Sequence, residues 1–183
     1  MTRIVGKQEY FEEALDVLAK DGFKGLSIGR LCTTLGVTSG SFYHHFGSWQ
    51  GFVDAVMQFW ENRQILQLKD LALGTGGPQA DLEALRKVTL GLHHGAEAAI
   101  RAWGGNDEGV RAVRHRVDDA RHKTVFRAIR GVVGDGKVAG VLTTLGMAML
   151  VGYQQLSTDG DHAELESLLD EYFRLIRSHA GGA

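Results

Sequence analysis

The segment from Ser27 to Phe46 constrains the fold of this chain more than any other segment. Four apolar residues share one face of a short helix at the spacing i, i+3, i+4 and i+7: Ile28, Leu31, Cys32 and Leu35. Ser27 precedes them as an N-cap, and Gly36 follows them, where a left-handed backbone costs glycine little. Thr38 can cap a second helix over 39–46. The segment therefore predicts two short helices joined by a tight turn.

Two helices joined in this way are typical of a DNA-binding helix-turn-helix, whose second helix enters the major groove. At about 100° per residue, Phe42 and Phe46 point inward, whereas Gly40, Tyr43 and His44 point outward. A bare glycine allows a close approach to the bases, and the other two side chains offer groups for phosphates and base edges. The same spacing also fits an ordinary hairpin of an all-α protein.

The remainder of the chain also reads as helix, since it has one proline and few alternating β-branched runs. We expect an all-α fold of about nine helices. They are predicted at 6–20, 28–35, 39–46, 48–73, 79–94, 96–103, between Asp107 and Gly134, at 137–156 and at 163–178. We expect a DNA-binding domain over 1–47 and a helical ligand-binding and dimerisation domain over 48–183.

Composition and charge indicate the compartment and the partners. The single cysteine excludes an internal disulfide, and no signal peptide is apparent, so we expect a cytoplasmic protein. The most apolar segment, 138–153, is shorter than a membrane span, so no membrane partner is expected. Residues 1–50 hold five basic and five acidic residues, although a DNA-binding domain is usually basic. The cations expected near DNA are Arg3, Lys7, Lys24 and Arg30.

Several spaced elements occur in a familiar order. An amphipathic first helix contains Phe11, Ala14, Leu15 and Leu18, and Asp21-Gly22-Phe23, Leu35-Gly36-Val37 and the run from Ser39 to Phe46 follow it. Over about residues 5–60 the chain closely resembles the N-terminal domain of the TetR (tetracycline repressor-like) transcription regulators. The resemblance implies these operator-facing positions: Ser27, Thr38, Ser39, Gly40, Ser41, Tyr43 and His44. Two residues depart from the family, because Trp49 stands where a lysine is usual and Gly29 lies inside the second helix.

The region from Ile100 to Trp103 and the long helix after it resemble, more weakly, the ligand-binding domains of that family. This resemblance implies a cavity for an unidentified small-molecule inducer. The candidate lining residues are Trp60, Arg63, His94, Trp103, His122, Phe126 and Tyr153. Aromatic residues on helices also serve as plain core, so both interpretations stay open. The arginines of the seventh helix, Arg121 among them, read as a solvated basic face.

The last two helices have wide apolar coverage, with Leu169 and Tyr172 on one stripe. They predict a homodimer with a two-fold four-helix bundle, against the alternative of a monomeric core.

His93 and His94 are adjacent and cannot easily chelate one metal, and the spacing of His115 and His122 is no known ligand pattern. We therefore expect no metal and no cofactor. The sequence shows no nucleophile–base–acid set or phosphate loop, so we expect no enzyme.

These patterns favour a homodimeric, ligand-responsive transcriptional regulator that acts as a repressor. It would bind a palindromic double-stranded operator and release it when the inducer enters the C-terminal domain. One alternative is a helical ligand-binding or scaffold protein that no longer binds DNA, which the neutral charge of residues 1–50 would suit. Another is a small helical metal-dependent enzyme built around the histidines.

Overall fold

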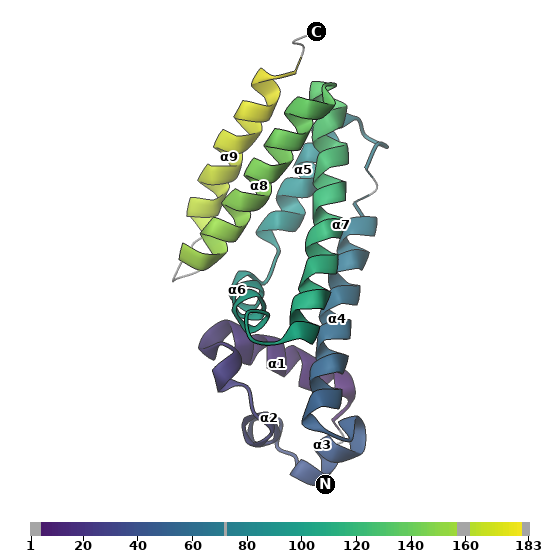
Figure 1. Ribbon diagram of the computed structural model, residues 1–183, viewed down its shortest axis with the longest axis vertical. Coiled ribbons are helices and arrows are strands. Elements are labelled where there is room, and N and C mark those ends of the chain that lie inside the picture. The colour runs from purple at the N-terminus through teal and green to yellow at the C-terminus, as the bar shows by residue number, and fades with distance from the viewer. Residues whose placement is uncertain (1–4, 72, 157–161, 181–183) are drawn as a thin grey trace. The chain divides into compact units, whose positions relative to one another are not determined.

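The computed structural model describes residues 5–71, 73–156 and 162–180. Within these ranges the chain forms nine α-helices and no strand, which confirms the predicted all-α fold (Figure 1). The helices are α1 (Lys7–Asp21), α2 (Ile28–Leu35), α3 (Ser39–Phe46), α4 (Trp49–Lys69), α5 (Pro78–Leu90), α6 (His94–Trp103), α7 (Glu108–Val133), α8 (Gly136–Leu156) and α9 (His162–Ser178). A short 3-10 helix, η1 (Phe23–Gly25), lies between α1 and α2.

Most predicted helix boundaries agree with the structure, and the exceptions have local causes. The fifth helix was expected to run to residue 94, but Gly91 ends α5 by donating its N–H to the carbonyls of Lys87 and Val88, both at 3.1 Å. Ser48 and Asp107 cap the starts of α4 and α7, since their side chains accept the backbone N–H groups of Gly51 and Val110 at 2.9 and 3.0 Å. The 3-10 turn η1 was not predicted.

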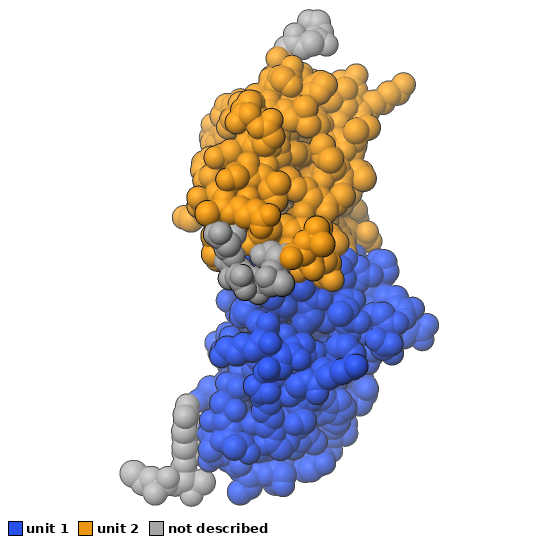
Figure 2. Space-filling model, turned by 90° about the vertical axis from the view of Figure 1, so that its left-hand side faces the viewer, with its two compact units in different colours: residues 1–63, 93–116 blue, residues 64–92, 117–183 orange. Residues whose placement is uncertain are grey.

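The chain forms two compact units, shown in blue and orange in Figure 2. Unit 1 comprises residues 1–63 and 93–116, and unit 2 comprises residues 64–92 and 117–183. Both α4 and α7 contribute residues to each unit. The predicted division at residue 47 therefore does not coincide with the division into compact units. It remains a prediction about which residues bind DNA.

In unit 1, α6 packs closely against α1, although the two helices are far apart in the sequence. A Cβ on Gly95 would lie only 3.1 Å from the carbonyl oxygen of Ala19, which is tighter than ordinary van der Waals contact, so this approach favours glycine. The rings of Phe23 and Trp103 are nearly parallel, with centroids 6.4 Å apart, and they join η1 to the end of α6. Residues beyond position 92 therefore complete the core of the N-terminal unit.

The first turns of α7 are tied to α4 within unit 1 by a bidentate ion pair. Arg116 donates from Nε and Nη2 to the two carboxylate oxygens of Glu61 at 2.6 and 2.8 Å. These hydrogen bonds lower the pKa of Glu61. The carboxylate is therefore charged at neutral pH and holds the two helices together.

In unit 2, α9 packs against α5 and α8 around a core that includes Leu82, Ile129 and Ile176. The Tyr172 hydroxyl on α9 donates to the carbonyl of Leu142 on α8 at 2.6 Å, and burial raises the pKa of this phenol. The α8 backbone comes so close to this ring that a methyl group on Gly146 would collide with it. A glycine on one helix and a tyrosine on the other therefore set how α8 and α9 pack.

Helix α8 is less covered than its sequence predicts. Its sequence has wide apolar coverage, but only 28% of its most apolar 18-residue window is buried within the described chain. Val141 is 70% exposed and Leu145 is 46% exposed; with Ala148 they form what we call the α8 outer stripe. The helix extends beyond both ends of the apolar segment 138–153, and with its 21 residues it could cross a membrane by length and composition alone.

Candidate nucleic-acid interface

The turn between α2 and α3 is held by the caps that the sequence predicts. Ser27 Oγ accepts the N–H of Arg30 at 3.3 Å, and Thr38 Oγ1 accepts the N–H of Ser41 at 3.4 Å. Gly36 adopts a left-handed backbone with φ 68°, and the thiol of Cys32 donates to the Thr38 carbonyl at 3.6 Å. Burial raises the pKa of that thiol, so it stays a donor at neutral pH. The two helices are therefore joined rigidly.

The inner face of α3 is fixed by a cluster of aromatic rings. Phe42 is fully buried, and its ring centroid lies 5.9 Å from that of Tyr10 on α1 and 5.2 Å from that of Phe52 on α4. The Tyr10 hydroxyl donates to Ser41 Oγ at 3.3 Å, and His45 Nε2 lies 2.9 Å from the Val5 carbonyl oxygen. An eight-residue helix is too short to be stable alone, so these contacts hold it in place.

The outer face of α3 is open to solvent. It consists of Thr38, Ser39, Gly40, Tyr43 and His44, all of them exposed, and we call it the α3 outer face. Tyr43 is a large aromatic residue that is nevertheless 51% exposed. Among the other predicted operator-facing residues, Ser27 is exposed at the start of α2, whereas Ser41 is half-buried beneath Tyr10.

Positive charge near this face is sparse. Arg30 forms an ion pair with Asp21 at 2.5 Å, and the Lys7 ammonium lies over the Phe46 ring, 5.7 Å from its centroid. Lys24 is exposed on η1, and Arg3 lies outside the described residues. Hydroxyls, ring edges and helix N-termini are therefore the main polar groups that this surface offers.

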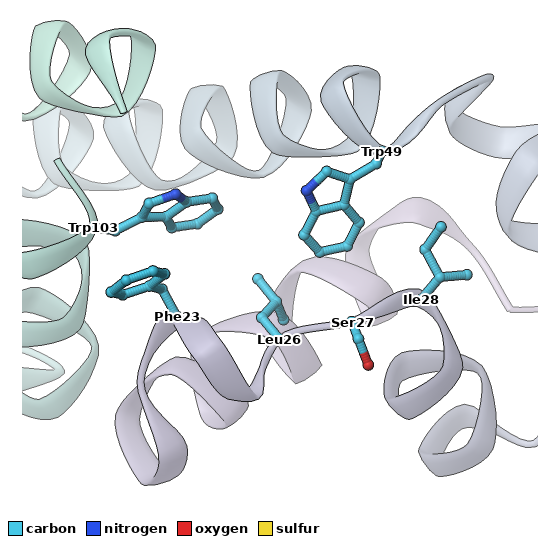
Figure 3. Close-up of a pocket in the computed structure, with 6 residues that line it drawn as sticks. All are labelled: Phe23, Leu26, Ser27, Ile28, Trp49 and Trp103. Atoms are coloured by element: carbon cyan, nitrogen blue, oxygen red, sulfur yellow. The ribbon is translucent and has the colours of Figure 1, made fainter. Parts of the chain in front are cut away.

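A groove lies beside the start of α2 in unit 1, with a volume of about 490 Å³ (Figure 3). Its walls are mostly apolar: Phe23, Leu26, Ser27, Ile28, Trp49 and Trp103. The indoles of Trp49 and Trp103 reach into it from the start of α4 and the end of α6 (Figure 3). Trp49 also packs on Phe42 and Phe52, with centroids 6.4 and 5.4 Å apart. The tryptophan at the position of the usual lysine therefore supports α3 from behind.

The structure divides the seven predicted ligand-lining residues between the two units. Four belong to unit 1: Trp60 is buried, Arg63 pairs with Glu12 at 3.1 Å, His94 begins α6, and Trp103 lines the groove just described. The other three belong to unit 2, where Tyr153 is buried, Phe126 is half-buried and His122 is exposed. The two sets are not brought together in one unit, and their role in binding a ligand remains a prediction.

Unit 2 contains a small cavity of about 40 Å³ that the sequence analysis did not predict. It is lined by Gln64, Gln67, Leu68, Leu85, Val88, Thr89, Leu92, Arg121, Val125, Met147 and Leu150. Arg121 was assigned to a solvated face, but it is buried and donates from Nη2 to Gln64 Oε1 at 2.5 Å. The sequence does carry a signal for this, because Arg121 follows Val117 by four residues and so lies on the apolar stripe of α7.

In the part of the chain that the structure describes, no three side chains of histidine, cysteine, aspartate or glutamate come together as metal ligands. The set of residues that the fold brings together most clearly is instead the helix-turn-helix. It presents a polar face on a helix that is packed from behind. Such a face can lie in the major groove of DNA.

Comparison with known proteins agrees with this geometry. Residues 11–56 match the family described as bacterial regulatory proteins, tetR family. A relative named HTH-type transcriptional repressor KstR2, from Mycobacterium tuberculosis, is 26% identical over 107 residues. That match covers 55% of this chain and 54% of the relative, so it spans about half the length of each protein.

The fold is also found in solved structures. A transcriptional regulator from Rhodococcus sp. Rha1 superposes with a TM-score of 0.77 at 19% identity, covering 98% of this chain and 100% of that one. The ketosteroid transcriptional regulator KstR2 of Mycobacterium tuberculosis gives a TM-score of 0.69 at 14% identity, covering 97% and 96%. At such identities the likeness shows the fold, whereas the match over residues 11–56 shows the type of N-terminal domain. Residues 11–56 of this chain are therefore similar to the N-terminal domain of the tetR family of bacterial regulatory proteins.

Proposed function

We propose that this protein is a homodimeric transcriptional repressor of the cytoplasm that binds a palindromic operator and releases it when a small molecule binds. In this proposal residues 1–47 contact the DNA, and residues 48–183 form the dimer and bind the effector. The match of residues 11–56 to the tetR family and the name of the repressor relative support regulation of transcription. The proposed DNA binding rests on the outer face of α3, and the proposed dimerisation rests on the α8 outer stripe.

The observation that carries DNA binding is the contrast between the two faces of α3. Phe42 is fully buried, whereas the next residue, Tyr43, is 51% exposed on an otherwise polar face. A helix packed firmly from behind can present hydroxyl and imidazole groups to base edges without losing its orientation. Ser27 lies at the N-terminus of α2, where free backbone N–H groups favour phosphate oxygens.

Dimerisation is proposed from the α8 outer stripe. Val141, Leu145 and Ala148 face outward at helical spacing, and Leu168 and Leu175 on α9 are also exposed. Two copies that pack α8 and α9 together would cover these side chains in a four-helix bundle. A two-fold dimer carries two recognition helices, which is why the operator is expected to be palindromic.

The test is selection of DNA by the full-length protein from a random duplex pool, followed by titration of the selected sequence. We expect a palindrome and a loss of affinity in Tyr43→Ala and His44→Ala, with helix content and dimerisation unchanged. Gly40→Leu should bind still more weakly, because its side chain would hold the helix away from the groove. His115→Ala removes an exposed histidine from α7 and is the matched control. Wild-type binding by all three α3 variants would contradict the assignment of the face.

A second candidate is a helical ligand-binding protein that no longer binds DNA. The observation in its favour is the low positive charge beside α3, where Arg30 is paired with Asp21 and Trp49 replaces the usual lysine. The same selection distinguishes the two functions. A wild-type dimer that enriches no duplex above background at low salt would support this second candidate.

A further inference from the structure

Two hollows in unit 2 meet at the same pair of residues. The small cavity described above has a volume of about 40 Å³. An outer groove between the end of α4 and α5 has a volume of about 410 Å³ and is lined by Gln67, Asp70, Leu71, Ala84, Lys87, Val88 and Gly91. Gln67 and Val88 line both hollows. The two hollows therefore adjoin each other at these two side chains.

Gln67 carries a buried acceptor that the described chain does not satisfy. Its Oε1 atom is inaccessible to solvent and has no hydrogen-bond partner among the described residues. Gln64, one turn earlier on the same helix, differs, because its Oε1 accepts a hydrogen bond from Arg121 at 2.5 Å. Nearly all buried acceptors in folded proteins are paired, since an unpaired one destabilises the fold. A donor from outside the chain would complete this site.

The two volumes limit how a ligand could lie. The inner cavity is far below the 300–1,000 Å³ or so that is usual for a small-molecule site, whereas the outer groove falls within that range. The body of a ligand would therefore occupy the outer groove, beside Leu71, Ala84 and Val88, and only a small group would reach the cavity. At Gln67 that group must be a hydrogen-bond donor.

We propose that Gln67 is the specificity-determining residue for the effector, a small, largely apolar molecule with a hydroxyl or N–H group that donates to Gln67 Oε1. The effector enters through the outer groove between α4 and α5. This inference rests on the proposed ligand response and gives it a chemical class. It does not depend on any contact with DNA, so it can be tested in the absence of DNA.

The first test measures thermal stability without any ligand. Gln67→Met keeps the length of the side chain and removes the unpaired amide oxygen, so the melting temperature should rise by about 3 °C or more. Gln58→Met is the matched control, because that glutamine is an exposed residue of α4 whose amide donates to Asn62 at 3.0 Å. It should leave the melting temperature nearly unchanged. A fall in the Gln67→Met variant would show that the amide is already satisfied and would overturn the proposal.

The second test uses two probes, benzyl alcohol and benzyl methyl ether, which share an apolar ring and differ in the donor. Backbone amide shifts of the full-length protein should change around residues 67 and 88, with about fivefold tighter binding of the alcohol, the effect expected of one hydrogen bond. Gln67→Met should abolish this preference. Ala84→Leu, which fills the outer groove alone, should weaken both probes.

Equal binding of the two probes, no binding at millimolar concentration, or shifts confined to other parts of the chain would each overturn the proposal. DNA titrations of the same variants separate it from the proposed function. If the probes bind as expected but the wild type selects no operator, the repressor function is wrong and the site stands. If the operator is bound and the probes show no preference, the site is wrong and the repressor function stands.

Discussion

The outer faces of α3 and α8 are both left uncovered by the described chain, but they differ in chemistry. The α3 outer face presents hydroxyls, an imidazole and a phenol, and exposing these polar groups to water costs little free energy. The α8 outer stripe presents Val141 and Leu145, whose exposure costs about 25 cal/mol for each Å² of apolar surface. The difference indicates two kinds of partner. The polar face suits a partner that is bound and released, and the apolar face suits one that stays bound.

The two helices also differ in what supports them from behind. Helix α3 has eight residues and depends on the rings of Tyr10, Phe42 and Phe52. Helix α8 has 21 residues and is held to α9 by the hydrogen bond from Tyr172, beside Gly146. Substitutions on the outer faces should therefore act mainly on binding, whereas substitutions behind them should act mainly on stability.

The largest effect is expected at the α8 outer stripe. Leu145→Glu would bury two uncompensated carboxylates in a two-fold dimer, which we expect to cost about 4 kcal/mol in total and to weaken dimerisation about a thousandfold. Sedimentation equilibrium should show folded monomers, and Lys123→Glu on the exposed face of α7 should remain dimeric. Leu169 and Tyr172 are less suitable sites for this substitution, because both are buried in the core of unit 2 itself. A dimer that survives Leu145→Glu unchanged would place the interface elsewhere.

The second prediction concerns the support of that stripe. Gly146→Ala should lower the free energy of unfolding by about 2 kcal/mol, since the new methyl group collides with the Tyr172 ring. Gly131→Ala on α7 is the control, because a Cβ there meets no described atom within 4 Å. Chemical denaturation of both variants measures the difference. If Gly146→Ala is as stable as the control, α8 and α9 do not pack as closely as described.

The third prediction tests the support of α3. Trp49→Lys adds a cation beside the DNA and removes an indole that packs on Phe42 and Phe52. Each added phosphate contact should steepen the plot of log affinity against log salt by about 0.9. We therefore expect tighter operator binding at low salt together with a melting temperature lowered by several degrees. Titrations at several salt concentrations and a thermal scan measure the two effects, and an unchanged salt slope would mean that residue 49 does not reach a phosphate.

The sequence predicted the helix-turn-helix in detail because its determinants are local. The caps at Ser27 and Thr38 and the left-handed turn at Gly36 depend only on residues within one or two helical turns. The bare stripe of α8 could not be predicted in this way. An apolar helix surface looks the same in sequence whether its own chain or a second copy covers it.

The two hollows of unit 2 depend on tertiary contacts, which the sequence does not show. Gln64 and Gln67 are polar residues of α4, and nothing in their sequence spacing sets them apart from other polar residues of a helix. Only the fold brings them together with Val88 and Arg121 around one cavity. The aromatic residues that were candidates for ligand contacts fall in two separate units. Large aromatic side chains mark where a core forms, and they say less about where a core is incomplete.

The smallest expected effect distinguishes two glycines of the helix-turn-helix. A Cβ on Gly29 would meet no described atom within 4 Å, and one on Gly40 would meet only Thr38 Oγ1 at an ordinary 3.5 Å. The fold therefore requires neither glycine, and alanine at either position should stabilise the protein by up to about 1 kcal/mol. On the α3 outer face, however, the methyl group of Gly40→Ala would enter the space between helix and base edges. Operator affinity should then fall about fivefold for Gly40→Ala, an effect near 1 kcal/mol, and stay within twofold or so of wild type for Gly29→Ala. Equal losses of affinity in both variants would mean that α2 lies as close to the DNA as α3 does. No loss in either variant would mean that neither the fold nor DNA binding requires a glycine at position 40.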